Sequence, residues 1–151
     1  MNITIKEIAS ADVDSSQEIF NSLEEDYIEF DKWIAKVKSD PERKVLVAST
    51  VEDNYVAVAI IKPEEWENDY FSSFPVTKLS TFKVREDYRN LGIGTALLGL
   101  AVGVAKVKGT KAIYLETLAK QENLIGFLEA NKFVRFAANY RGEIVMSRLG
   151  L

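Results

Sequence analysis

The middle of the chain, residues 78–118, most strongly restricts what this sequence can fold into. The run KLSTFKV (78–84) is rich in apolar and β-branched residues, which is typical of a strand. After a charged turn, apolar residues recur at helical spacing from Ile93 to Val104, and KAIYLETL (111–118) is again strand-like. A strand, a helix and a second strand in this order predict a parallel crossover within a sheet that helices cover.

Further strands and helices are expected on both sides of this crossover. Strands are predicted at 2–8, 44–50, 55–61, 133–139 and 143–149, and helices over two amphipathic stripes within 13–37 and over 123–130. Residues 62–77 have no clear period, and a connection of this length in a compact domain is often functional. The order βααβββαβαββ predicts an α/β (α+β) fold. We expect one domain over 1–151, with a mixed sheet of about seven strands flanked by about four helices.

Composition excludes several kinds of chemistry and partner. The chain has no cysteine and no histidine, so disulfides, cysteine nucleophiles, histidine bases and Cys- or His-ligated metals are ruled out, and no metal is expected. A net charge of −4 without a basic arm argues against nucleic acid. No stretch approaches the roughly 20 apolar residues of a membrane span. The lack of cysteine agrees with a reducing, cytoplasmic location.

Two glycines, Gly92 and Gly94, stand where the central helix is predicted to begin. The first turn of a helix carries unpaired N–H groups and the positive end of the helix dipole, so a phosphate can approach bare backbone there. Asn90 tolerates a left-handed conformation, and Arg85 and Arg89 add positive charge. The glycines alone fit a helix start without a ligand equally well. The dinucleotide fingerprint and the P-loop pattern are both absent.

The pattern R-x-x-G-x-G at 89–94, placed after an apolar strand, resembles the pyrophosphate-binding motif of the GNAT superfamily of acetyl-CoA-dependent N-acetyltransferases. The stretch LETLAKQENLIGFLEANKF (115–133) is similar to that family's downstream segment, in which Leu-Glu-Val precedes an Asn, an aromatic pair and a Gly-Phe. The resemblance implies that acetyl-CoA is the co-substrate. It also implies that CoA is held by the backbone of Phe82, Lys83 and Val84, by Arg89, Asn90, Leu91, Gly92, Ile93, Gly94 and Thr95, and by Asn123.

Two catalytic groups that are common in this family are missing. Leu128 stands in place of a tyrosine general acid, and Lys78 stands where some members carry a glutamate. Glu116 matches the Glu of Leu-Glu-Val and is the candidate base. The alternative for Glu116 is a strand carboxylate that is bonded to a neighbour or faces water. Tyr70, in the 62–77 segment, is a weaker candidate.

The predicted function is therefore an N-acetyltransferase that moves an acetyl group from acetyl-CoA to a primary amine by direct transfer. The alternative is a catalytically weak acyl-CoA-binding or sensing domain of the same fold, and a nucleotide-phosphate binder has little support. The acceptor is a small-molecule amine or a peptide, and a homodimer is left open. By resemblance, residues 21–31 wall the acceptor cleft. Their acids predict a cationic acceptor, although solvated helix faces explain the same charges.

Overall fold

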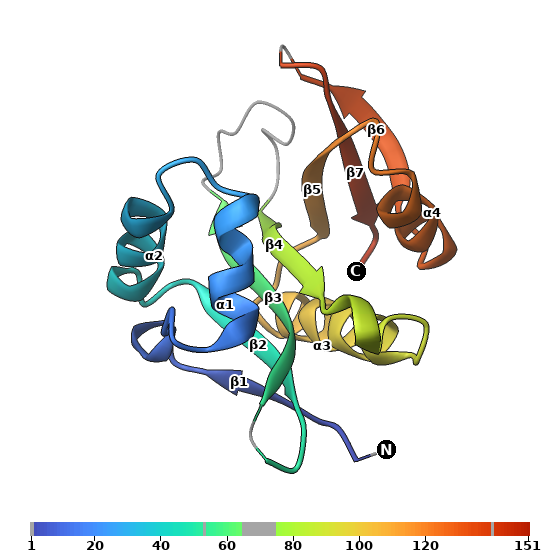
Figure 1. Ribbon diagram of the computed structural model, residues 1–151. Coiled ribbons are helices and arrows are strands. Elements are labelled where there is room, and N and C mark those ends of the chain that lie inside the picture. Colours follow the sequence, from blue (N-terminus) through green and yellow to red (C-terminus); the bar gives the residue numbers. More distant parts are fainter. Residues whose placement is uncertain (1, 53, 65–74, 140) are drawn as a thin grey trace. The chain divides into compact units, whose positions relative to one another are not determined.

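The computed structural model describes residues 2–52, 54–64, 75–139 and 141–151. Within these residues the chain forms seven strands and four α-helices, so the predicted element order is confirmed (Figure 1). The strands are β1 (Thr4–Ile8), β2 (Lys44–Ser49), β3 (Tyr55–Glu64), β4 (Val76–Val84), β5 (Ala112–Leu118), β6 (Val134–Ala138) and β7 (Glu143–Leu149). The helices are α1 (Glu18–Asn21), α2 (Phe30–Ser39), α3 (Ile93–Val107) and α4 (Glu122–Ala130), with 3₁₀ helices η1 (Ser10–Asp12), η2 (Ser22–Glu25) and η3 (Glu86–Tyr88). None of the helices in these ranges has the length and apolar character that crossing a bilayer requires.

The strands form a mixed sheet in the order β1-β2-β3-β4-β5-β7-β6. β1, β2 and β3 pair antiparallel. β4 and β5 pair in parallel from Val76↔Ala112 to Lys78↔Tyr114, which confirms the predicted crossover through α3. β6 and β7 form the expected antiparallel hairpin. The chain divides into two compact units, residues 1–62 with 81–101 and residues 63–80 with 102–151.

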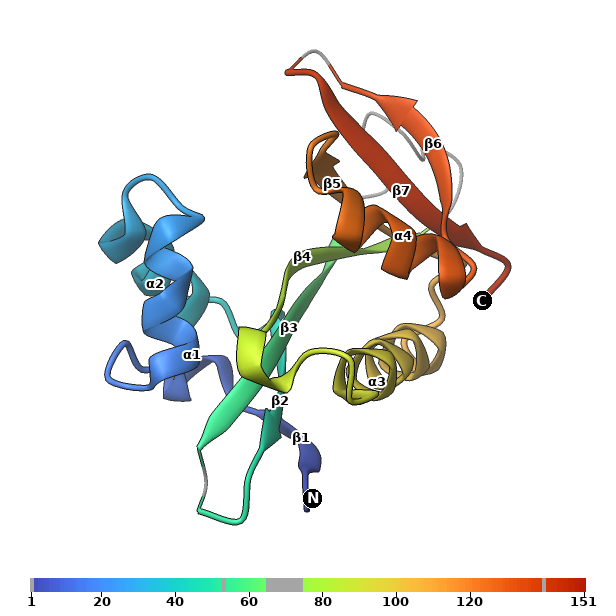
Figure 2. The ribbon, with the colours of Figure 1, turned by 45° about the vertical axis from the view of Figure 1, so that its right-hand side comes forward.

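The core of the first unit lies where α1 and α2 cover one face of β1–β3 (Figures 1 and 2). Val45 and Val47 of β2 alternate toward this face, as do Val58 and Ile60 of β3, and all four are fully buried with Phe20 of α1. Each such aliphatic side chain contributes about 1.5–3 kcal/mol when it leaves water. Leu46 of β2 and Ala59 of β3, which point to the opposite face, are fully buried as well, so these two apolar strands are covered on both faces.

Two segments are shorter in the structure than the sequence predicts: the first helix and the unpatterned connection at 62–77. The helix expected from Val13 begins only at Glu18, because Asp14 Oδ1 accepts a hydrogen bond from the Ser16 backbone N–H at 2.9 Å. Such an Asx turn offers the backbone an alternative to helix. The unpatterned segment 62–77 is also shorter than expected, since β3 and β4 both extend into it.

The second unit contains β5, β7 and β6, with α4 on one face of these strands (Figure 2). Leu128 of α4 and Phe133 just beyond it are both buried. The Phe133 N–H donates to the Leu128 carbonyl at 3.0 Å, and the Lys132 N–H donates to the Glu129 carbonyl at 3.2 Å. These two bonds, with Lys132 at φ 73°, make a Schellman ending, which favours glycine at the left-handed position. Lys132 thus takes a left-handed conformation that a glycine would adopt at less cost.

Candidate functional site

The loop between β4 and α3 presents bare backbone to solvent. Asn90 and Gly92 take left-handed conformations, with φ of 62° and 82°, and a Cβ added at Gly92 would have no atom within 4 Å. The first bond of α3 runs from the Ala96 N–H to the Gly92 carbonyl at 3.1 Å, so the amides that precede Ala96 have no intrahelical acceptor. The first turn of α3 contains no acidic residue. This geometry fits a phosphate group held by backbone N–H groups and the helix dipole.

The other residues of the loop differ in how far they are exposed. Leu91 and Thr95 are exposed, and Gly94 is half-buried. Ile93 is buried, so it anchors the start of α3 in the core. The predicted pyrophosphate loop is therefore a helix start that is fixed on its inner side and open on its outer side.

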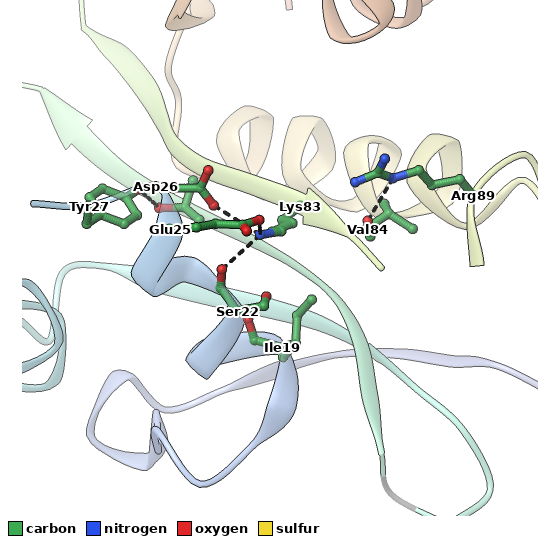
Figure 3. Close-up of polar contacts among 9 residues, drawn as sticks. Ile19, Ser22, Glu25, Asp26, Tyr27, Lys83, Val84 and Arg89 are labelled. Atoms are coloured by element: carbon green, nitrogen blue, oxygen red, sulfur yellow. Dashed lines mark hydrogen bonds and ion pairs between the residues drawn. The ribbon is translucent and has the colours of Figure 1, made fainter. Parts of the chain in front are cut away.

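The two arginines near the loop differ in how much charge they offer. Arg85 donates to Glu18 Oε2 at 3.2 Å and to Asp87 Oδ2 at 2.9 Å, so carboxylates already balance its charge. Arg89 Nε instead donates to the Val84 carbonyl, the last of β4, at 3.0 Å (Figure 3). This bond brings the loop and the strand end together. It leaves Arg89 as the better candidate to meet an anion.

The end of β4 is held to the N-terminal helices by two side chains on one strand face. Thr81 and Lys83 are two residues apart and so point the same way, with Phe82 between them directed to the other face. Lys83 Nζ donates to the Ser22 carbonyl at 2.9 Å, to Glu25 Oε1 at 2.5 Å and to Asp26 Oδ2 at 3.1 Å (Figure 3). Lys83, predicted as a backbone contact to CoA, therefore has a side-chain role that the sequence did not reveal.

Tyr27 makes the second attachment to β4. Its hydroxyl and the Thr81 hydroxyl lie 2.5 Å apart, and its ring stacks on Trp33 of α2 with centroids 4.1 Å apart. Burial raises the pKa of the Tyr27 hydroxyl above its ordinary value of 10.0, and the hydrogen bond to Thr81 opposes this shift only in part. Tyr27 is thus a neutral hydrogen-bonding group that ties α2 to β4.

The acids of the 21–31 segment fall into two groups. Glu25 and Asp26 bind Lys83, and this ammonium holds the pKa of Glu25 below its ordinary value of 4.5. Glu24, Glu29 and Asp31 line an open depression of about 440 Å³, within which Glu29 also pairs with Lys32 at 3.2 Å. The predicted acidic wall is therefore only partly available to an acceptor.

Glu116 lies in the second unit, within a polar network between strands. Its Oε1 accepts from Lys78 Nζ at 2.9 Å, and its Oε2 accepts from Asn139 Nδ2 at 2.6 Å. Arg141 lies 3.8 Å from Oε2 and pairs with Glu143 at 3.0 Å. The carboxylate is 11% exposed. Both oxygens thus have donors that stabilise the ionised form, which matches the alternative of a strand carboxylate bonded to its neighbours.

The other candidates are placed as follows. Asn123 is exposed in the first turn of α4. Leu128, which replaces the expected tyrosine, is fully buried and faces the interior of its unit. Tyr70 lies outside the described residues. The first unit holds the strand end and the loop, and the second holds Glu116 and Asn123.

Sequence reasoning missed two sets of contacts. The sequence indicates Lys78 only as the replacement of a family glutamate. In the structure Lys78 pairs with Tyr114 in the parallel β4–β5 ladder, two residues before Glu116, and its ammonium binds Glu116. Lys83 was read only for its backbone. The one available signal was the i, i+2 spacing of Thr81 and Lys83, which places both on one face of a strand.

The sequence matches the Acetyltransferase (GNAT) family over residues 5–133, which is most of the chain. The chain belongs to the GNAT acetyltransferase family. The resemblance seen in the 89–94 and 115–133 motifs is thereby confirmed, whereas the role of each GNAT site residue stays a prediction. No protein of curated function matches the sequence significantly.

Solved structures of GNAT proteins share the fold over nearly the whole chain. Arabidopsis thaliana NAA60, solved with a bisubstrate analogue, has a TM-score of 0.77 at 15% identity, covering 98% of both chains. The PaiA N-acetyltransferase of Thermoplasma acidophilum, solved with coenzyme A, has a TM-score of 0.71 at 16% identity, covering 99% of both chains. Ard1 of Thermoplasma volcanium has a TM-score of 0.75 at 18% identity, covering 99% of this chain and 98% of that one. At these identities the similarity establishes the fold.

Proposed function

We propose that this protein is an N-acetyltransferase that moves an acetyl group from acetyl-CoA to a primary amine by direct transfer. The observation that carries the proposal is the junction between β4 and α3. There, Gly92 at φ 82° leaves the helix start open to a phosphate, in a chain of the GNAT family. The CoA bound in the PaiA structure supports CoA as the ligand here.

The reaction needs no covalent enzyme intermediate. The amine nitrogen attacks the thioester carbonyl carbon, the C–N bond forms, the C–S bond breaks, and the sulfur leaves with the proton that the nitrogen loses. The chain must therefore hold the two substrates together, stabilise the developing oxyanion and accept a proton. We assign the pyrophosphate to the amides of residues 89–95 and the pantetheine arm to the backbone of Phe82, Lys83 and Val84. We assign a further CoA contact to Asn123.

Glu116 is the proposed base. Lys78 and Asn139 each donate to one oxygen of Glu116, and they hold the carboxylate in place without by themselves preventing proton uptake, because each oxygen has two lone pairs. Tyr70 is kept as a weaker candidate for proton transfer.

The alternative function is an acyl-CoA-binding domain with little catalysis. The leucine at position 128 favours it, because Leu128 has no hydroxyl that could donate a proton to the leaving group. The two functions share CoA binding and differ in turnover. An amine panel of peptides and small amines separates them: the enzyme releases CoA faster when an acceptor is present, and the binding domain does not. The bisubstrate analogue on NAA60 supports including peptides in the panel.

The cofactor assignment is tested by Gly94→Asp, with Gly94→Asn as the matched control. Aspartate in the first turn of a helix is favourable to the helix dipole, so the variant should stay folded. Its charge opposes the pyrophosphate, whereas asparagine adds nearly the same bulk without charge. Calorimetry should give a binding free energy for CoA of about −8 to −5 kcal/mol in the parent. The Gly94→Asn variant should bind CoA more weakly, and the Gly94→Asp variant should not bind it. If the folded aspartate variant binds CoA as well as the parent, the loop is not the phosphate site.

A further inference from the structure

The ammonium of Lys83 sits in a complete set of acceptors. A lysine ammonium has three N–H donors, and Lys83 Nζ has three acceptors: the Ser22 carbonyl, Glu25 Oε1 and Asp26 Oδ2, at 2.9, 2.5 and 3.1 Å (Figure 3). Only 15% of the Lys83 side chain is exposed. The 22–26 turn is therefore a built ammonium site whose present occupant is a residue of the same chain.

The other lysine of this region has a much looser contact. Lys32 pairs with Glu29 at 3.2 Å, but the two side chains are 79% and 67% exposed, and a pair of this kind contributes little. Lys83 is also supported by its neighbour on the strand, because Thr81 points the same way and holds Tyr27. The Lys83 contacts thus help to attach η2 to β4. Lys32 takes no part in this attachment, so its replacement is a control for removing a lysine charge from the same segment.

The carboxylates on the outer side of this site can still be reached from solvent. Glu25 is 72% exposed and Asp26 is 47% exposed, although both bind Lys83. A second ammonium would have to share these two carboxylates with Lys83, at close range and with like charge. Removing the Lys83 charge would leave two carboxylates around an empty ammonium position.

We propose that Lys83 is a specificity-determining residue, which occupies the ammonium site of Glu25 and Asp26 and so disfavours acceptors that carry an additional positive charge. The proposal rests on the proposed acetyltransferase function, in which this turn lies on the acceptor side. It revises the expectation from composition, since two of the acids that predict a cationic acceptor already share one positive charge of this chain.

The first test is calorimetric and needs no turnover. Spermidine is titrated at low salt into the parent, Lys83→Met, Lys83→Met with Glu25→Gln and Asp26→Asn, and the matched control Lys32→Met. Lys83→Met should bind spermidine about threefold to tenfold more tightly than the parent, the range for one or two partly exposed ion pairs. The gain should disappear in the triple variant. Equal affinity in parent and Lys83→Met, a gain that persists in the triple variant, or the same gain in Lys32→Met would overturn the proposal.

The second test is kinetic and separates specificity from structural damage. The ratio of kcat/KM for a diamine over the matched monoamine, such as 1,4-diaminobutane over butylamine, should rise by a similar factor in Lys83→Met and return to the parent value in Lys83→Arg. Loosening of the 22–26 turn lowers both values together and leaves the ratio unchanged, so an unchanged ratio contradicts the proposal. If the parent acetylates no amine, the acetyltransferase function fails, and the spermidine titration still decides the role of Lys83.

Discussion

Replacing Gly92 by alanine isolates the backbone conformation on which the CoA assignment depends. The new methyl group would meet no atom within 4 Å, so a steric clash does not contribute. The cost arises from φ 82°, which is about 1–2 kcal/mol for a residue with a Cβ. Alanine also lowers the conformational entropy of the unfolded chain, which stabilises the folded protein by about 0.4–1 kcal/mol and offsets part of this cost. We therefore expect Gly92→Ala to lower the free energy of unfolding by about 1 kcal/mol, or about 2–4 °C in Tm.

Gly99→Ala is the matched control, seven residues further along. Gly99 is exposed inside α3, its added methyl group also meets no atom within 4 Å, and its φ is not positive. Alanine there should stabilise the chain by about 0.5–1 kcal/mol, because glycine is unfavourable inside a helix. Glycine to alanine should thus lower the free energy of unfolding at position 92 and raise it at position 99. Urea unfolding of parent and both variants measures the difference.

The same variants report on CoA. If alanine moves residue 92 out of the left-handed region, the amides of the loop turn away from the pyrophosphate, so CoA affinity should fall in Gly92→Ala and stay unchanged in Gly99→Ala. A Gly92→Ala protein as stable as Gly99→Ala would refute the claim that positive φ constrains this loop. A destabilised Gly92→Ala that binds CoA like the parent would separate the loop's conformation from phosphate binding.

Three further predictions concern other residues. Lys132→Gly should raise the free energy of unfolding by about 1 kcal/mol in a urea titration, since φ 73° favours glycine, and no change would argue against the left-handed ending of α4. Glu116→Gln should cut turnover by about 10²–10⁴ while calorimetry gives an unchanged CoA affinity, and equal turnover at saturating substrates would remove Glu116 from the mechanism. The Lys83 ammonium lowers the pKa of Glu25, so the stability that Glu25 contributes is present above its ordinary 4.5 and is lost as pH falls through the lower folded-state value. The parent should therefore exceed Glu25→Gln in stability at neutral pH, by a difference that shrinks in acid, and a difference independent of pH would contradict the ion pair.

Local patterns were sufficient for the elements and for the backbone of the 89–94 loop, whereas its role as a phosphate site stays a prediction. Period-2 and period-3.6 spacing are properties of neighbouring residues, so the strands and the crossover through α3 could be predicted from the sequence. Asparagine and glycine are the residues that most readily adopt left-handed backbone. The structure has such φ values at Asn90 and Gly92, 62° and 82°. The first helix was predicted too long, because an Asx turn at Asp14 competes with helix for the same backbone groups.

The sequence alone determined the fold, the family motif and the absence of cysteine and histidine chemistry, because each follows from residue types and short-range spacing. Only the tertiary structure decided what the charged side chains do. Lys83 meets Glu25 and Asp26 across 58 and 57 residues, and Lys78 meets Glu116 across 38. No periodicity encodes such pairs, since they depend on which strand faces which turn after folding. Composition predicts acids that are available to a ligand. In the structure Glu25, Asp26 and Glu116 are instead bound to lysines of the same chain.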